Sequence, residues 1–478
     1  MPPSARSQTL LVAIGQALSA GVSLLTVAWL ARNMPASELG IYLYFVAVAA
    51  SLEGLSDLGL RLTGVTSLSN AASPSARRAT LDALWRLKVM LSLGVVMVML
   101  LARESGLLQY ADRTTALVLA VVTVTLPSAS PLVWDVRARG LQWLEASLLV
   151  TYRLLMLGAV MLIDLQAADA VTVLVTLLAT NVAFMLMLGV ARLRWVERSA
   201  RTFPSTVEHF AMLRTAAPLG VSLLLAQIAP RIWVLLLAAL ATSEDVAVFT
   251  VAVSVVQTVL MFGVAAGAAY LPVLSRLARE SDDQFRALAG RLLEAMALVG
   301  SLVAVGMAAS APGLVPGVFG AAMRPAGTIL VVLSLLPPVM LVSFTGRIVL
   351  GAAGIGRADL LSTIGGLCLG LLAAVVLWSS LGTWAVVAGY AVSESATGLG
   401  KIAALLRFGA VEPRCLRRDL TVCALPVLLA VGGGLWLARA GCGVAQAVVA
   451  GAASVLVYAF VLCAHPTVRS RGLLGFLP

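Results

Sequence analysis

The sequence predicts an all-α polytopic membrane protein with about 14 transmembrane helices, arranged as two six-helix lobes followed by a C-terminal helix pair. Three observations predict this class. Hydrophobic residues make up 60% of the 478 residues and charged residues only 12%, whereas soluble domains carry about 25% charged residues. Apolar runs long enough to cross a bilayer, about 20 residues each, recur along the whole chain. Basic residues gather at alternate ends of these runs, as they do in membrane proteins.

Fourteen apolar runs are expected to form the spans. They lie at about 9–31, 39–61, 86–102, 115–135, 146–163, 170–191, 213–240, 246–271, 289–310, 326–346, 360–378, 384–406, 419–438 and 444–463. The third run is short, and Arg86 and Lys88 are expected to snorkel at its start. The first run is long and many others follow it, which is not typical of a removable signal peptide.

Basic residues set the expected orientation. With the N-terminus in the cytoplasm, 26 of the 33 Lys and Arg residues fall on the cytoplasmic side, and only five fall on the other. The remaining two, Arg153 and Arg231, lie inside spans. This bias predicts cytoplasmic N- and C-termini and an even number of spans. It also accounts for the net charge of +11 without a nucleic-acid partner.

Several functional classes are not expected. The five cysteines are scattered and there are only two histidines, so neither a disulfide framework nor a metal site is predicted. No phosphate-binding loop is present, which argues against ATP hydrolysis by this chain. We expect no cofactor, although coupling to H⁺ or Na⁺ is compatible with the pattern.

An internal repeat indicates how the lobes are related. The stretch "SELGIYLYFVAVAASLEG" from Ser37 aligns with "SEDVAVFTVAVSVVQTVLMFG" from Ser243, six spans later. An even number of spans per repeat keeps both copies in one orientation, related by a pseudo-two-fold axis along the membrane normal. The predicted parts are an N-terminal lobe at 8–200, a C-terminal lobe at 208–410 and a helix pair at 415–466.

The repeat region resembles a known family. "LARNMPASELGIYLYFVAVAASLEGLSDLGL" is similar to the first two helices of the bacterial polysaccharide flippases, the Wzx-type branch of the MATE-like multidrug, oligosaccharidyl-lipid and polysaccharide exporter superfamily. "PRIWVLLLAALATSEDVAVFTVA" resembles their seventh helix and the turn after it, and "LGAAGIGRADLL" resembles part of their later helices. The similarity covers about residues 8–410. Where that family commonly has an acid after the seventh-helix arginine, this chain has Trp233, so any charge balance at Arg231 would have to come from another helix.

Charged residues inside spans are the candidate functional residues, because lipid penalises each by about 2.5–3.5 kcal/mol. Glu53, Asp57 and Arg61 recur every four residues, which predicts a stripe along one helix face. Asp57 and Arg61 could simply pair near the cytoplasmic surface. Glu53 lies deeper, and the aligned second-half positions, Leu260, Val264 and Ala268, carry no charge. The stripe therefore belongs to one lobe only.

Arg231 and Gln227 lie one turn apart within the seventh span, beside the helix-bending Pro230. Arg231 could bridge to a buried carboxylate such as Glu53 or Glu394, or it could contact an anion in a cavity between the lobes. Arg153, in the fifth span, could line the cavity or form a structural pair. Glu394 could be a hydrogen-bonded acid, a cation site or a partner for arginine. Asp135 and Arg347, near span ends, are interpreted as interfacial anchors.

The resemblance implies a flippase, not an enzyme, that moves polyprenyl-diphosphate-linked oligosaccharides from the cytoplasmic to the periplasmic leaflet of the bacterial inner membrane by alternating access. Arg231, Arg153, Arg61 and Gln227 would contact substrate, while Glu53, Asp57 and Glu394 would balance charge or take up the coupling ion. The expected partners are the lipid-linked oligosaccharide, the bilayer, and possible polymerase and chain-length proteins. Alternatives are a peptidoglycan-precursor flippase, a cation-coupled drug exporter, or a polymerase or ligase with catalytic charges on outer loops.

Overall fold

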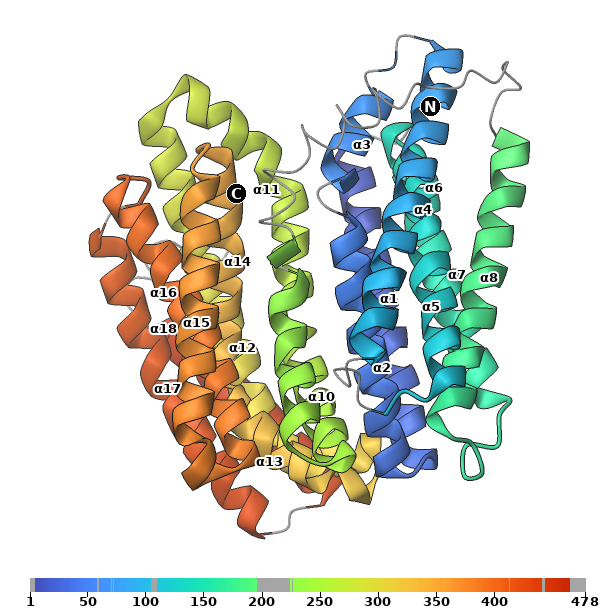
Figure 1. Ribbon diagram of the computed structural model, residues 1–478. Coiled ribbons are helices and arrows are strands. Elements are labelled where there is room, and N and C mark those ends of the chain that lie inside the picture. Colours follow the sequence, from blue (N-terminus) through green and yellow to red (C-terminus); the bar gives the residue numbers. More distant parts are fainter. Residues whose placement is uncertain are drawn as a thin grey trace. The chain divides into compact units, whose positions relative to one another are not determined.

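The computed structural model describes residues 5–57, 60–69, 71, 73–104, 110–195, 224–225, 227–411, 413–440 and 443–464. Within these ranges the protein is all α-helical, with no strand (Figure 1). Packing divides the chain into two compact units, which are described separately. Unit 1 comprises residues 1–26 and 33–247, and unit 2 comprises residues 27–32 and 248–478.

Among its described residues, unit 1 contains six helical segments that are long and apolar enough to cross a bilayer, and one of them is made of the two helices α5 and α6. The helices are α1 (Ala5–Asn33), α2 (Ala36–Asp57), α3 (Leu60–Ser69), α4 (Pro74–Glu104), α5 (Arg113–Ser128), α6 (Ser130–Ala138), α7 (Gln142–Met161) and α8 (Ala170–Trp195). The connection from α7 to α8 lies at one end of this unit, where α4 ends and α5 begins, and the connection from α6 to α7 lies at the other end (Figure 1). An apolar helix at Gln227–Leu240 also belongs to unit 1.

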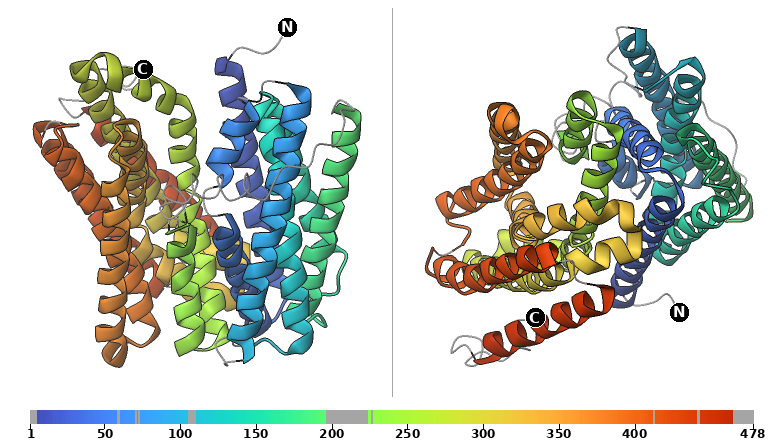
Figure 2. Two further views of the ribbon diagram at one scale, coloured as in Figure 1. Left: turned by 45° about the horizontal axis from the view of Figure 1, so that its top comes forward. Right: turned by 90° about the horizontal axis from the view of Figure 1, so that it is seen from below.

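Unit 2 contains the remaining helices. They are α10 (Ser243–Gln257), which begins in unit 1, α11 (Leu260–Glu280), α12 (Asp282–Phe319), a 3₁₀ turn η1 (Ala321–Met323), α13 (Arg324–Leu333), α14 (Leu336–Ala352), α15 (Gly356–Leu381), α16 (Thr383–Arg407), α17 (Pro413–Ala440) and α18 (Val444–Ala464). Both α17 and α18 pack on the long helix α12 (Figure 2).

The predicted membrane fold is confirmed. Nine helices within the described ranges are long and apolar enough to cross a bilayer, and the bent pair formed by η1–α13 and α14 makes a tenth. Three further apolar helices in the described ranges are shorter. Helix α16 is long enough to cross a bilayer but carries the charged residues Glu394 and Lys401. Large apolar side chains such as Leu372 and Val376 are exposed on outer helix faces. A bilayer would cover such faces, and the chain is a multi-pass membrane protein.

Prolines mark two of the helix breaks. The α5–α6 break falls at Ala129, where Pro131 lies in the first turn of the second helix. The 60° bend between α13 and α14 falls directly before Pro337 and Pro338. Proline lacks an N–H and is tolerated only in the first helical turn without breaking hydrogen bonds.

The internal repeat has a structural counterpart. Helix α2 begins at Ala36 after the short turn that follows α1, and α10 begins at Ser243 after the turn that follows the helix at Gln227–Leu240. The aligned serines, Ser37 and Ser243, therefore both lie in the first turn of a helix. The division into lobes at 8–200 and 208–410, with a helix pair at 415–466, stays a prediction.

Candidate functional site

Glu53 and Arg231 are brought together in unit 1. The Glu53 carboxylate on α2 acts electrostatically on the Arg231 guanidinium, which is partly buried on the helix at Gln227–Leu240. The Nε atom of Arg231 is buried and has no hydrogen-bond partner in the described residues. Trp233 occupies the position at which the resembling family commonly has an acid on the same helix. In this chain, Glu53 brings a carboxylate near Arg231 from another helix. Of the two carboxylates predicted as partners, Glu53 is the one in the same unit.

Gln227 lies beside this pair because α2 has a glycine at the point of contact. A Cβ atom placed on Gly54 would lie 3.4 Å from Oε1 of Gln227 and 3.6 Å from its Cβ. This is ordinary van der Waals contact, so the two helices pack directly at Gly54. Gln227 therefore contacts Gly54, the residue after Glu53. It lies one turn from Arg231 on its own helix, so the two side chains share a helix face.

Arg153 belongs to the same polar region of unit 1. Its guanidinium lies 5.4 Å from the centroid of the Tyr152 ring on α7. Glu53 acts electrostatically on Tyr152, and Arg153 acts on both Tyr152 and Tyr42 of α2. Arg153 makes no salt bridge to Glu145, which binds Arg137 through two hydrogen bonds. Tyr152 therefore lies within electrostatic reach of both Glu53 and Arg153.

Asp57 is paired with Lys88 of α4. The Nζ atom of Lys88 donates to Oδ1 of Asp57 at 2.7 Å, and it lies 5.8 Å from the centroid of the Trp134 ring on α6. The predicted snorkelling of Lys88 is wrong, because α4 begins at Pro74 and places Lys88 in mid-helix with 1% exposure. The predicted stripe is also divided, since α2 ends at Asp57 and Arg61 lies on α3. The side chain of Arg61 lies outside the described residues.

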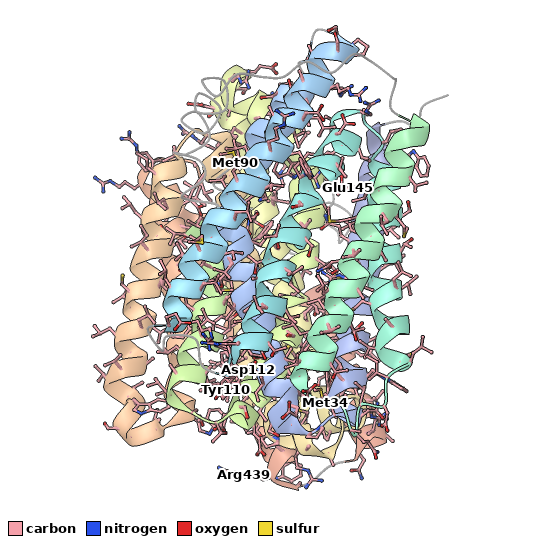
Figure 3. All side chains as sticks on the ribbon, turned by 45° about the vertical axis from the view of Figure 1, so that its right-hand side comes forward. Met34, Met90, Tyr110, Asp112, Glu145 and Arg439 are labelled. Carbon is pink, nitrogen blue, oxygen red and sulfur yellow. The ribbon has the colours of Figure 1, made fainter. Side chains whose placement is uncertain are left out.

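A network of ion pairs joins α4, α6 and α7 near the α6–α7 connection. Asp135 is 4% exposed and lies between Arg77 (Nε–Oδ1 3.2 Å) and Arg139 (Nε–Oδ2 3.0 Å). Glu145 at the start of α7 lies toward this end of unit 1, and Asp112 lies toward the other end (Figure 3). Asp135 is thus a buried network residue, not the interfacial anchor that its position near a span end suggested.

Unit 2 has a charged cluster of its own. Lys401 on α16 is 1% exposed and lies 2.9 Å from Oδ1 of Asp359 on α15. Nε of Arg347 on α14 lies 3.3 Å from both carboxylate oxygens of Asp359. Glu394, two turns before Lys401 on α16, acts electrostatically on Lys401 and Arg347. Glu394 therefore belongs to a cluster with two cations and a second acid.

Lys88, Lys401 and Asp359 were not singled out as candidates, although two of them left a signal in the sequence. Lys88 shares a helix face with Leu81, Leu84 and Leu91, at spacings of three, four and seven residues, which is the spacing of a buried stripe. Lys401 lies on one face with Gly398 and Leu405, and both of these residues are buried. A charge within an apolar stripe indicates a buried partner.

Charges near the connection from α4 to α5 are engaged locally. Arg103 pairs with its neighbour Glu104. Asp112 accepts a hydrogen bond from the backbone N–H of Thr115 at 2.8 Å, which caps α5. Hydrogen bonds from Thr115 lower the pKa of the Asp112 carboxyl. In the described ranges, no group of three His, Cys, Asp or Glu residues is placed to hold a metal ion. The expected lack of a cofactor stays a prediction.

This helical arrangement is the fold of several solved flippase and multidrug-transporter structures. It is similar to a solved structure of the lipid II flippase MurJ in an inward closed conformation, with a TM-score of 0.72 and 12% identity over 95% of this chain and 99% of that chain. An inward-facing MATE family multidrug transporter of the MOP superfamily matches with a TM-score of 0.65 and 18% identity, over 82% and 95% of the two chains. The Vibrio cholerae MATE transporter VcmN matches with a TM-score of 0.59 and 16% identity, over 84% and 96%.

The family follows from the sequence match. The model of the family described as "Polysaccharide biosynthesis protein" matches residues 6–278, which is more than half of the chain. The chain belongs to this family, and the resemblance drawn from the motifs is confirmed. No curated protein matches the chain.

Proposed function

We propose that this chain is a flippase for polyprenyl-diphosphate-linked oligosaccharide repeat units in the bacterial inner membrane, with both termini in the cytoplasm. It would carry the repeat units from the cytoplasmic to the periplasmic leaflet for surface polysaccharide synthesis. The observation that carries this proposal is the presence of two guanidiniums within the spans of unit 1. Arg231 lies within electrostatic reach of Glu53, and Arg153 makes no salt bridge among the described residues.

The chemistry of the substrate explains why such a site is useful. A lipid-linked oligosaccharide has an apolar tail, an anionic diphosphate and a polar sugar chain. Each polar group moved into hydrocarbon without a partner costs several kcal/mol, so the head group needs a polar path. Guanidinium groups make strong, charge-assisted hydrogen bonds to phosphate. We propose that Arg231, Arg153, Arg61 and Gln227 contact the head group as the protein alternates its access.

The acidic residues complete the proposed site. Glu53 would balance Arg231 when substrate is absent, and Glu53 or Glu394 would exchange a proton or sodium ion during the cycle. Asp57, whose carboxylate binds Lys88, would fix the end of α2 that carries Glu53. Polymerase and chain-length proteins are proposed as partners that consume the translocated repeat unit.

The first test replaces Arg231 with alanine in the organism that carries the gene. We expect surface polysaccharide to be lost while the protein remains in the membrane at its normal level. Deletion of the gene should cause lipid-linked intermediate to accumulate on the inner leaflet. An Arg276→Gln variant is the control, because Arg276 is exposed and its ion pair among the described residues is with Glu280, one helix turn away. Normal polymer with Arg231→Ala would remove Arg231 from the mechanism.

The second candidate function is transport of a lipid-linked peptidoglycan precursor. The fold similarity to lipid II flippase MurJ over 95% of this chain supports it. Both substrates share a polyprenyl diphosphate, so Arg231 would serve either one. Depletion of the chain separates them: loss of surface polysaccharide with normal cell-wall synthesis supports the first proposal, and lysis supports the second.

Two other functions are less well supported. A drug exporter for cationic substrates would favour acids over arginines in its spans. A polymerase or ligase would need catalytic charges on its outer connections, yet Arg103 pairs with Glu104 and Asp112 caps a helix. We therefore propose that the chain is not an enzyme.

A further inference from the structure

We propose that Tyr152, Arg153 and Asn181, here called the donor cluster, form a second anion-binding group in unit 1 besides Arg231. The donor cluster would receive the anionic oxygens of the transported molecule. This inference rests on the proposed transport function and deepens it, because it names the chemistry that a second point of contact recognises. It also assigns a role to Tyr152 and Asn181, which were not among the candidates from the sequence.

The three side chains are held in a defined arrangement. The hydroxyl of Tyr152 on α7 donates to Oδ1 of Asn181 on α8 at 2.6 Å, and both side chains are buried. The ring of Phe184, one turn further along α8, lies 5.0 Å from the Tyr152 ring. Tyr152 is thus fixed at its hydroxyl and at its ring, and Arg153 lies 5.4 Å from the ring centroid. Such cation–π contacts orient a guanidinium without neutralising it.

Asn181 leaves one strong donor unused. Its Nδ2 atom is buried and has no hydrogen-bond partner in the described part of the protein, and the whole residue is 2% exposed. Buried amide groups are almost always hydrogen-bonded, so an unsatisfied N–H₂ group indicates a missing acceptor. A role limited to joining α7 and α8 would use only Oδ1 and would not require an amide.

The charges around the donor cluster define the missing acceptor. Arg153 makes no salt bridge within the described ranges, and the nearby Glu53 acts electrostatically on Tyr152. Tyr42, buried on α2, lies within electrostatic reach of both Tyr152 and Arg153. A guanidinium and an amide N–H₂ group both donate, so the ligand must bring acceptors and negative charge. Carboxylate and phosphate oxygens fit this requirement, whereas neutral sugar hydroxyls would leave the guanidinium without a counter-charge.

These anionic oxygens could come from an acidic sugar in the repeat unit or from the diphosphate of the lipid carrier. Binding of soluble probes to the purified full-length chain distinguishes the two sources. The probes are a galacturonic acid oligomer, a neutral galactose oligomer of equal length, and inorganic diphosphate. Affinity is measured from the shift of the thermal unfolding midpoint in detergent micelles with probe concentration. We expect at least one anionic probe to bind and the neutral oligomer not to bind.

The decisive variant is Asn181→Asp. It keeps the size of the side chain and the oxygen that accepts from Tyr152, but it replaces the donating Nδ2 with an anionic oxygen. We expect binding of the anionic probe to weaken at least tenfold. Thr180→Val is the matched control, because Thr180 is the adjacent buried residue and its hydroxyl bonds the Thr176 carbonyl of its own helix. The control should bind as the wild type does.

Two results would overturn the proposal. One is a wild-type protein that binds neither anionic probe, and the other is an Asn181→Asp variant that binds as tightly as the wild type. If Asn181→Asp fails to fold, Arg153→Gln decides the matter by the same measurement and the same tenfold threshold. If the cellular deletion experiment fails while anion binding and its loss in the variants are observed, the transport function is refuted and the donor cluster stands.

Discussion

Removing either charge of the Asp57–Lys88 pair should destabilise the protein strongly, whereas removing both should cost much less. The two groups lie 2.7 Å apart, and their side chains are 10% and 1% exposed, respectively. Lys88→Met leaves a buried carboxylate without its cation. Asp57→Asn leaves a buried ammonium near the Trp134 ring. The double variant, Asp57→Asn with Lys88→Met, leaves neither charge.

The magnitude follows from the distance and the burial. At an effective dielectric constant of about 20, two unit charges at this separation attract by about 6 kcal/mol. Desolvation costs several kcal/mol per ion and offsets most of this attraction. The intact pair is therefore close to neutral overall, but a lone buried charge costs about 3–5 kcal/mol. We expect the loss of unfolding free energy to lie at the upper end of this range for Lys88→Met and at the lower end for Asp57→Asn. In the Asp57→Asn variant, a cation–π contact with Trp134 stabilises the remaining ammonium.

The assay is the free energy of unfolding in mixed micelles, measured by titration with denaturing detergent for the wild type, both single variants and the double variant. The double variant should lie within about 2 kcal/mol of the wild type, well below the sum of the singles. Arg276→Gln is the control: it breaks an exposed pair with Glu280 and should cost no more than about 0.5 kcal/mol. Additive losses in the double variant would refute a direct buried pair.

Two further predictions concern packing and a helix cap. Gly366→Ala should cost about 1–3 kcal/mol or more by overpacking, because its Cβ would lie 2.1 Å from Oγ1 of Thr397. The adjacent Gly365→Ala has open space, and it should be neutral or gain up to about 1 kcal/mol of helix propensity. Equal effects on the unfolding free energy would contradict the close packing of α15 on α16. At the start of α8, hydrogen bonds from Thr172 lower the pKa of the Asp169 carboxyl. The cap therefore stabilises the folded state above the unfolded-state pKa of about 3.9, and this stabilisation is lost as the pH falls through the lower folded-state value. Asp169→Ala should cost about 1 kcal/mol or less at pH 7, because the cap is exposed, and the difference from wild type should vanish at strongly acidic pH. A difference that grows on acidification would contradict this assignment.

Much of the fold could be predicted because the rule for crossing lipid is local. A run of about 20 apolar residues must form a helix that satisfies its own backbone, whatever surrounds it. The helices therefore follow the apolar runs, and the breaks at Ala129 and before Pro337 follow the prolines. The internal repeat could be recognised in the sequence because the start of a helix, as at Ser37 and Ser243, is also set by nearby residues. The boundary of the third span was wrong because Lys88 was read as a residue that reaches water.

The candidate site could be predicted only in part. Glu53, Arg231 and Arg153 stood out because lipid penalises charge, and that penalty depends only on position within a span. Tyr152 and Asn181 left no comparable signal, because neither residue is charged and 29 positions separate them in the chain.

The sequence by itself thus determined which segments form membrane-length apolar helices and which of their residues would be costly in lipid. Only the tertiary structure decided which partner each one has. Lys88 meets Asp57 from 31 residues away, and Lys401 meets Asp359 across the α15–α16 contact. The choice of partner depends on the face that each helix turns toward its neighbour and on the distance between their axes. Both are set by the packing of all the side chains between the helices, so no single segment encodes them.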